Sequence, residues 1–259
     1  MNMTIISSNP IYVYFWHNKF MRLVLWNCKM RFRDDLEKAF KLNPDVLVIS
    51  ECEEIDRLNL PRENIVNPSD QYWIGDNQHK GLAVFTFNNY KIDLYNKYSP
   101  DFKYILPLKV SKNDEAFHVV GVWTKKVGDK VKGHNNYIRQ VHLSMLEYEE
   151  FITNNNVIIC GDFNSNLIWE RTGVDNNHQV VLDQLAEKEI YSSYHQFFNE
   201  EQGKETQATY YHYHKKDRPF HIDFCFMSKN LLDNLNHVEL GSFEEWSGLS
   251  DHVPMVVDF

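Results

Sequence analysis

Two continuously apolar runs are the clearest features of the chain's hydrophobic pattern. Val46-Leu47-Val48-Ile49 and Val157-Ile158-Ile159-Cys160 contain no polar position, whereas a strand with one exposed face alternates apolar and polar residues. Each run therefore predicts a strand covered on both faces. Arg22 to Asn27 predicts a third core strand near the start of the chain.

Apolar residues spaced by three and four predict three helices. The first carries Phe32, Leu36 and Phe40 on one face and ends at Asn43-Pro44, because proline cannot continue a helix. A longer helix is expected from His134 to Thr153, and a weaker one from Asn177 to Lys188. Each would bury one face against a sheet.

Shorter strand-like runs fill much of the remaining sequence. They lie at residues 72–74, 81–86, 90–94, 104–110, 117–123, 208–211, 222–227, 238–240 and 253–257. The first five have few helical patterns between them, which indicates a mixed or antiparallel sheet. Because buried strands and covering helices recur in both halves, we expect one layered α/β domain over residues 21–259, with residues 1–20 as an extension.

The composition indicates a large buried core and a reducing compartment. The chain of 259 residues is 43% apolar and 14% aromatic, enough for a sizeable core. Its four cysteines form no C-x-x-C pair, which favours buried, reduced thiols over disulfides or a zinc site. The apolar stretch Ile11 to Trp16 is too short to span a bilayer and lacks a preceding basic segment. We expect a cytoplasmic protein without a membrane anchor.

Polar clusters follow or border the predicted core strands. They are Trp26-Asn27, Ser50-Glu51, Gly161-Asp162-Phe163-Asn164 and Ser250-Asp251-His252. Side chains at strand ends can meet at one edge of a sheet even when they are distant in sequence. Oxygen ligands from one or two carboxylates suit Mg²⁺, so Glu51, with Asp251 and the amide of Asn27, would make a sensible metal site. Taken alone, Glu51 is better explained as a solvated loop acid at a strand end, and the other clusters favour the metal site.

The remaining polar residues suggest how a phosphoester would be cleaved. Asp162 would orient and deprotonate a water, and Asn164 would donate a hydrogen bond to a phosphate oxygen, although the same four residues could form an ordinary turn. Asp223 lies in a strand-like run, where an unpaired carboxylate is costly, so it needs a partner. His252 is the natural partner, because an acid bonded to one ring nitrogen fixes the tautomer and stabilises the charged imidazole.

Together these motifs resemble those of the endonuclease/exonuclease/phosphatase family. The matching segments are Leu25-Trp26-Asn27, Ile49-Ser50-Glu51, the run ending in Trp123, Gly161-Asp162-Phe163-Asn164, Ile222-Asp223-Phe224 and Ser250-Asp251-His252. The resemblance implies a deoxyribonuclease I-like, four-layer α/β sandwich of two mixed β-sheets flanked by helices. It also implies Mg²⁺, with Mn²⁺ as a possible substitute, and in-line attack of water.

The resemblance also implies residue roles. Asn27, Glu51 and Asp251 would hold the metal, Asp162 would activate water, and Asn164 would contact phosphate. Asp223 would orient His252, which would bind or protonate the phosphoryl oxygen. Two positions depart from the family's pattern: Trp123 lies where many relatives have tyrosine, and His221 where arginine is common.

The substrate is less well defined by the sequence. A net charge of −9 disfavours indiscriminate nucleic-acid binding, but basic residues gather after Trp123 (Lys125, Lys126, Lys130, Lys132) and around the aromatic run 210–214 (Lys215, Lys216, Arg218). Both segments could instead be solvated loops. Candidate substrate-binding residues are Trp123, Arg139, Tyr211, His214 and His221.

We therefore expect a nuclease that acts on DNA or RNA. A phosphatase or phosphodiesterase acting on a small-molecule or lipid phosphoester is the main alternative, and a catalytically silent phosphate-binding protein is a further one. The sequence indicates no obligate protein partner.

Overall fold

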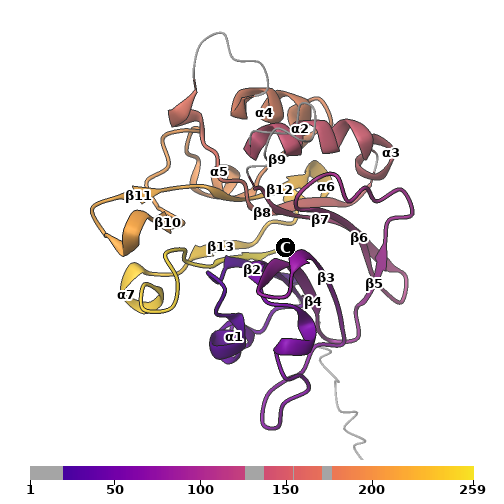
Figure 1. Cartoon of the computed structure of the whole chain (residues 1–259). Coiled ribbons are helices and arrows are strands. Elements are labelled where there is room, and N and C mark those ends of the chain that lie inside the picture. The colour runs from indigo at the N-terminus through magenta and orange to yellow at the C-terminus, as the bar shows by residue number, and fades with distance from the viewer. Residues whose placement is uncertain (1–19, 126–136, 154, 171–176) are drawn as a thin grey trace, which may run out of the picture.

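Two six-stranded β-sheets packed face to face form the centre of the molecule, with helices on their outer faces (Figure 1). The computed structural model describes residues 20–125, 137–153, 155–170 and 177–259. The arrangement confirms the expected α/β sandwich of two sheets between helices. The division into an extension and one domain stays a prediction, and residues 1–19 lie outside the described part.

The first sheet is mixed and has the strand order β13-β14-β1-β2-β4-β3. Its strands are β1 (Arg22–Asn27), β2 (Val46–Cys52), β3 (Asp70–Asn77), β4 (Lys80–Thr86), β13 (His237–Leu240) and β14 (Met255–Asp258). β1 and β2 are parallel, whereas the other neighbouring pairs are antiparallel. The parallel pair brings the carboxyl ends of β1 and β2 to the same edge.

The second sheet is also mixed and has the order β5-β6-β7-β8-β12-β9. Its strands are β5 (Lys91–Leu94), β6 (Ile105–Lys112), β7 (Glu115–Trp123), β8 (Val157–Asp162), β9 (Ile190–Ser192) and β12 (Asp223–Ser228). β7 and β8 are parallel, and β12 runs antiparallel to β8. The start of β12 therefore lies beside the end of β8.

Alternate residues of the central strands face different layers. Val46 and Val48 of β2 pack against the second sheet, and Leu47 and Ile49 pack against α1 (Phe32–Phe40). In β8, Ile158 faces the first sheet. On its other face, Val157 and Ile159 pack with α2 (Tyr137–Glu147), α3 (Glu149–Ile152) and α4 (His178–Ala186). Burial of both faces explains why these two strands have no polar position.

The structure differs from the sequence-based expectation in two places. The long helix predicted to Thr153 is divided at Tyr148 into α2 and α3, and residues 134–136 lie outside the described part. The strands between residues 70 and 123 do not form one sheet, because β3 and β4 join the first sheet and β5 to β7 join the second.

Several short elements were not predicted. They are α5 (Ser193–Phe198), α6 (Lys229–Leu232), α7 (Phe243–Trp246) and β11 (Pro219–Phe220); β11 pairs with β10 (Tyr210–Tyr211), which lies in the predicted run 208–211. None is long enough to show a hydrophobic period.

All four cysteines are buried and free, as the sequence predicts. Cys28 and Cys52 belong to the outer core beside α1, and Cys160 and Cys225 belong to the core between the sheets. Burial raises the pKa of each thiol, because the apolar surroundings disfavour the thiolate. Among the described helices, none combines the length and apolar character needed to cross a bilayer.

Gly161 is required by the backbone at the end of β8. Its φ is +136°, and a Cβ atom there would lie 1.9 Å from the carbonyl oxygen of Val122 in the neighbouring strand. Any side chain would therefore push β7 and β8 apart next to Asp162.

We predict that Gly161→Ala lowers the free energy of unfolding by at least ~2 kcal/mol, because sparsely populated backbone and a steric clash act together. Urea denaturation would measure the loss. Gly248→Ala is the matched control, since no atom lies within 4 Å of the added Cβ. Equal stability of the two variants would contradict this account of Gly161.

Candidate active site

Asn27 and Glu51 come together because β1 and β2 are parallel. Asn27 is in register with Ser50, and an irregularity between Ser50 and Cys52 turns Glu51 out of the ladder with a φ of 58°. This left-handed conformation is uncommon for glutamate and points to a functional constraint. The Asn27 amide donates to Glu51 Oε1 at 3.5 Å.

Asp162 is held in one orientation by three donors. Asn27 Nδ2 donates to its Oδ2 at 2.9 Å, Asn164 Nδ2 donates to the same oxygen at 3.0 Å, and the Asn164 backbone N–H donates to Oδ1 at 2.9 Å. The Asn164 amide also donates to the Thr124 carbonyl at 3.2 Å. Both amide hydrogens of Asn164 are thus directed to protein acceptors.

Burial and charge make Asp162 unusually basic. Burial, followed by the negative charge of Asp223, raises the pKa of Asp162 to about 7, although His252 and the Asn27 hydrogen bond act in the opposite direction. A carboxyl group poised near neutral pH suits proton transfer from water. A nearby cation would stabilise the ionised form of this carboxyl group.

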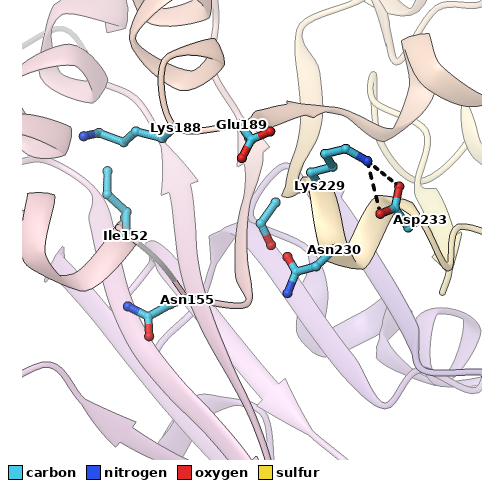
Figure 2. A pocket seen from close by; sticks show the side chains of 8 residues that line it. Ile152, Asn155, Lys188, Glu189, Lys229, Asn230 and Asp233 are labelled. Carbon is cyan, nitrogen blue, oxygen red and sulfur yellow. Dashed lines mark hydrogen bonds and ion pairs between the residues drawn. The ribbon is translucent and has the colours of Figure 1, made fainter.

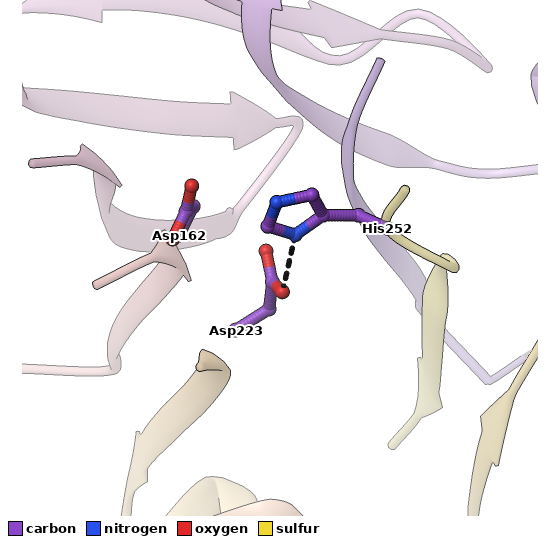
Figure 3. A group of neighbouring side chains, drawn as sticks. All are labelled: Asp162, Asp223 and His252. Carbon is purple, nitrogen blue, oxygen red and sulfur yellow. Dashed lines mark hydrogen bonds and ion pairs between the residues drawn. The ribbon is translucent and has the colours of Figure 1, made fainter. Parts of the chain in front are cut away.

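Asp223 and His252 form the expected pair. His252 Nδ1 lies 2.8 Å from Asp223 Oδ2, and Figure 3 shows the imidazole directed toward this carboxylate with Asp162 nearby. The register of β8 and β12 places Asp223 opposite Asp162. Burial lowers the pKa of His252, but the charge and hydrogen bond of Asp223 outweigh it and raise the pKa to about 9. The imidazolium is therefore favoured at neutral pH.

The loop before β14 ties His252 to the first sheet. Ser250 Oγ donates to the Asn27 carbonyl at 2.7 Å and accepts from the His252 backbone N–H at 3.1 Å. Trp26 Nε1 donates to the His252 carbonyl at 3.1 Å. These bonds fix His252 relative to Asn27.

Six of the seven residues predicted for catalysis and metal binding line one pocket of about 470 Å³. They are Asn27, Glu51, Asp162, Asn164, Asp251 and His252. Asp223, the seventh, is buried and contacts His252.

The pocket also contains residues for which the sequence predicted no individual role, although Tyr210 and His212 belong to the aromatic run 210–214 and Ile222 to a motif segment. Lys29 Nζ lies 2.8 Å from Asp251 Oδ2 and 2.6 Å from His214 Nε2. The remaining lining residues are Met30, Trp169, Tyr210, His212, Phe220 and Ile222. Lys29 follows Asn27 by two residues, and Trp169 belongs to the short 3₁₀ helix Leu167–Trp169 after the Asp162 turn. Their proximity in sequence to the motifs was the one available signal.

Two predicted substrate contacts need correction. Trp123 is only 4% exposed and stacks on Tyr104 with ring centroids 5.0 Å apart, and His221 is 3% exposed. Neither side chain lines the pocket, because the core encloses both.

The other three predicted contacts also lie outside the pocket lining. Arg139 lies on α2, and Tyr211 packs on Phe243 with ring centroids 4.7 Å apart. His214 reaches the pocket only through Lys29. Lys126, Lys130 and Lys132 lie outside the described residues.

A second polar pocket, of about 360 Å³, lies at the other end of β8 and β12 (Figure 2). Its two lysines are already paired, Lys229 with Asp233 at 2.9 Å and Lys188 with Glu149 at 2.8 Å. It therefore presents little uncompensated positive charge to a phosphate.

Comparison with known proteins agrees with this geometry. The sequence model of the Endonuclease/Exonuclease/phosphatase family matches residues 24–252. The chain belongs to this family. No curated protein matches the sequence significantly.

Solved structures similar to this member of the endonuclease/exonuclease/phosphatase family include three nucleases. The endonuclease domain of TRAS1, a telomere-specific non-LTR retrotransposon, is 15% identical with a TM-score of 0.62, covering 93% of this chain and 98% of that one. An AP endonuclease from Archaeoglobus fulgidus is 14% identical with a TM-score of 0.66, covering 92% and 99%. A 3′-5′ exonuclease (NExo) from Neisseria meningitidis is 18% identical with a TM-score of 0.64, covering 92% and 99%. At these identities the likeness shows the fold.

The donor set of this family member fits a hard divalent cation. Three carboxylates line the pocket, from Glu51, Asp162 and Asp251, and Lys29 is the single lysine or arginine among its described lining residues. An anionic phosphoester would be repelled by this surplus unless a cation entered. Within the described residues, the Glu51 carboxylate accepts one side-chain hydrogen bond, so it has oxygen lone pairs left for coordination.

A second group of possible ligands is closer together. Ligand atoms of Asp162, Asp223 and His252 lie within 4.8 Å of one another. However, His252 already uses Nδ1 to bind Asp223, and Asp162 accepts three protein hydrogen bonds. These commitments favour Glu51 over this group as the centre of a metal site.

We predict that in the metal-free protein His252 titrates near pH 9 and that Asp223→Asn lowers this pKa by at least one unit, because the carboxylate is the main cause of the increase. NMR of the assigned ring resonances would measure both values. Asp233→Asn, at the other end of β12, is the control. Since the folded pKa exceeds the ordinary value of about 6.5, the pairing stabilises the fold fully below that pH, and the contribution is lost as pH rises through the folded pKa. An unchanged pKa in Asp223→Asn would contradict the assignment.

Proposed function

We propose that this protein is a Mg²⁺-dependent phosphodiesterase that hydrolyses nucleic acid. One observation carries the proposal: the oriented Asp162 carboxylate and the Asp223–His252 pair face the same pocket as Glu51. Family membership supports hydrolysis of a phosphoester bond. A base, a cationic hydrogen-bond donor and a free carboxylate are together what such a reaction requires.

Asp162 would take the proton of the attacking water. Its orientation is set by the amides of Asn27 and Asn164, so these residues would position the base. The hydrogen bonds of Asn164 support this positioning function over direct contact with phosphate. The imidazolium of His252, held by Asp223, would bind a phosphoryl oxygen and stabilise the charge that develops on it.

Glu51 and Asp251 would hold the cation, and Asn27 would keep Glu51 in place. When bound, the cation would neutralise the phosphate and lower the barrier to attack by water. Lys29 forms an ion pair with Asp251 and would therefore reduce the negative charge that remains at the pocket.

Aromatic rings at the pocket support a nucleic-acid substrate. Trp169 and Phe220 have ring centroids 5.1 Å apart, and Phe220 and Tyr210 are 6.3 Å apart, so the three form a continuous row. The Trp169 residue is 47% exposed. Exposed rings beside a phosphate site are suited to stacking on bases. The titles of the three similar structures name nucleases.

We predict that the purified protein with Mg²⁺ cleaves at least one of single-stranded DNA, duplex DNA, abasic duplex or RNA, and that Asp162→Asn lowers the rate about 10³-fold, as expected for loss of a general base. Gel electrophoresis of labelled oligonucleotides would measure the rates. Asp183→Asn, an exposed acid on α4, is the control. Hydrolysis confined to small phosphoesters would refute the nucleic-acid assignment, and inactivity toward all substrates would refute the phosphodiesterase.

We also predict that Glu51→Gln weakens binding of Mn²⁺, used as a spectroscopic substitute for Mg²⁺, at least about 10-fold, because a neutral amide replaces a charged ligand. Electron paramagnetic resonance would measure free Mn²⁺ directly, independent of activity. Glu54→Gln, outside the pocket lining, should leave the affinity unchanged. Equal affinity of Glu51→Gln and the wild type would exclude Glu51 as a ligand.

A further inference from the structure

A second histidine faces the pocket and has no part in the function proposed above. His212 begins the 3₁₀ turn His212–His214 that connects β10 to β11. Its Nδ1 lies 2.7 Å from the hydroxyl of Tyr210, and both residues line the pocket with Asp162 and His252.

Backbone and ring contacts fix this pair relative to His252. Tyr210 forms an antiparallel bridge with His252, and their ring centroids are 4.6 Å apart. The His212 backbone N–H donates to the Arg218 carbonyl at 3.0 Å, closing the turn. His212 therefore has a fixed position relative to His252, although it lies on an exposed hairpin.

One ring nitrogen of His212 is left for a ligand. Nδ1 is occupied by Tyr210, and Nε2 has no hydrogen-bond partner among the described residues. Burial, followed by the charges of Asp251 and Asp162, raises the pKa of Tyr210 to about 12, so the phenol keeps its proton at neutral pH. The pair thus presents Nε2 of the imidazole, and not the phenol, as its reactive atom.

Cleavage of a phosphodiester leaves an alkoxide that needs a proton, and the other donors of the pocket are poorly suited to supply it. The amides of Asn27 and Asn164 do not ionise and are bonded to Asp162. The Lys29 ammonium is held between Asp251 and His214. His252 is committed to Asp223 and the phosphoryl oxygen.

We propose that His212 is the general acid of this site: its Nε2–H protonates the leaving oxygen, and Tyr210 positions the ring. This inference rests on the proposed phosphodiesterase function. His212 would be a catalytic residue, because it touches the leaving group, and Tyr210 a positioning residue.

Two protons move in the proposed step. Water attacks phosphorus as Asp162 takes one of its protons, and the bond between phosphorus and the leaving oxygen breaks. The Nε2 proton of the His212 imidazolium moves to that oxygen, which leaves as an alcohol. The ring becomes neutral and keeps its Nδ1–H bonded to the Tyr210 oxygen. Solvent then restores the Nε2 proton and accepts the one held by Asp162.

The test compares two substrates that differ in their need for an acid. Thymidylyl-thymidine releases a nucleoside alkoxide, which requires protonation, whereas the p-nitrophenyl ester of thymidine 5′-phosphate releases a stable phenolate. With Mg²⁺ present, His212→Asn should lower kcat for the dinucleotide about 10²-fold or more, and change kcat for the nitrophenyl ester little. Tyr210→Phe should lower kcat for the dinucleotide less than His212→Asn does, again with little effect on the nitrophenyl ester. His237→Asn, which changes an exposed histidine on the edge strand β13, is the control.

The outcomes separate this inference from the function on which it rests. Equal losses on both substrates, or no loss on either, would overturn the acid role of His212 while wild-type hydrolysis still supported the phosphodiesterase. Wild-type protein that hydrolyses neither these esters nor oligonucleotides would refute the phosphodiesterase itself. If circular dichroism shows that His212→Asn is unfolded, His212→Gln and Tyr210→Phe with the same two substrates decide the question.

Discussion

The hydrogen bond from Asn27 to Asp162 joins the two sheets at the active-site pocket. Asn27 ends β1 in the first sheet and Asp162 ends β8 in the second, and their side chains meet at 2.9 Å. Face-to-face sheets lie about 10 Å apart, a gap that two short polar side chains can bridge. The orientation of the base therefore depends on the core between the sheets, which sets that spacing. Core residues between the sheets, such as Val48 and Ile158, therefore support the site although they do not line its pocket.

Because the site lies where the buried strands leave the core, part of it could be predicted from the sequence. Continuous apolar runs at β2 and β8 identify strands buried on both faces, and the polar residues that follow them must lie where the strands leave the core. Glu51 and Asp162 are predicted in this way, and Asn27 is predicted from the end of the third core strand, Arg22 to Asn27. Asp223 and His252 were paired because a buried carboxylate needs a partner.

Other features depend on contacts that no local pattern contains. Trp123 and His221 follow or precede motif residues, but which face of a strand or loop they occupy is decided by packing against Tyr104 and Tyr194. Lys29 reaches the pocket through Asp251, more than 200 residues away, and His212 is bonded to Tyr210, whose backbone pairs with the distant His252. The short helices and the strand β11 are likewise too brief to leave a periodic signal.

The distribution of the four thiols makes two of the three apolar layers of the core separately observable. Cys28 and Cys52 are sealed beneath α1, whereas Cys160 and Cys225 lie between the sheets. A thiol reagent can reach each cysteine only when the surrounding layer opens. The rate at which each cysteine pair is labelled therefore reports the opening of its own layer. The native chain thus carries built-in probes of whether the layer beneath α1 loosens before the two sheets separate.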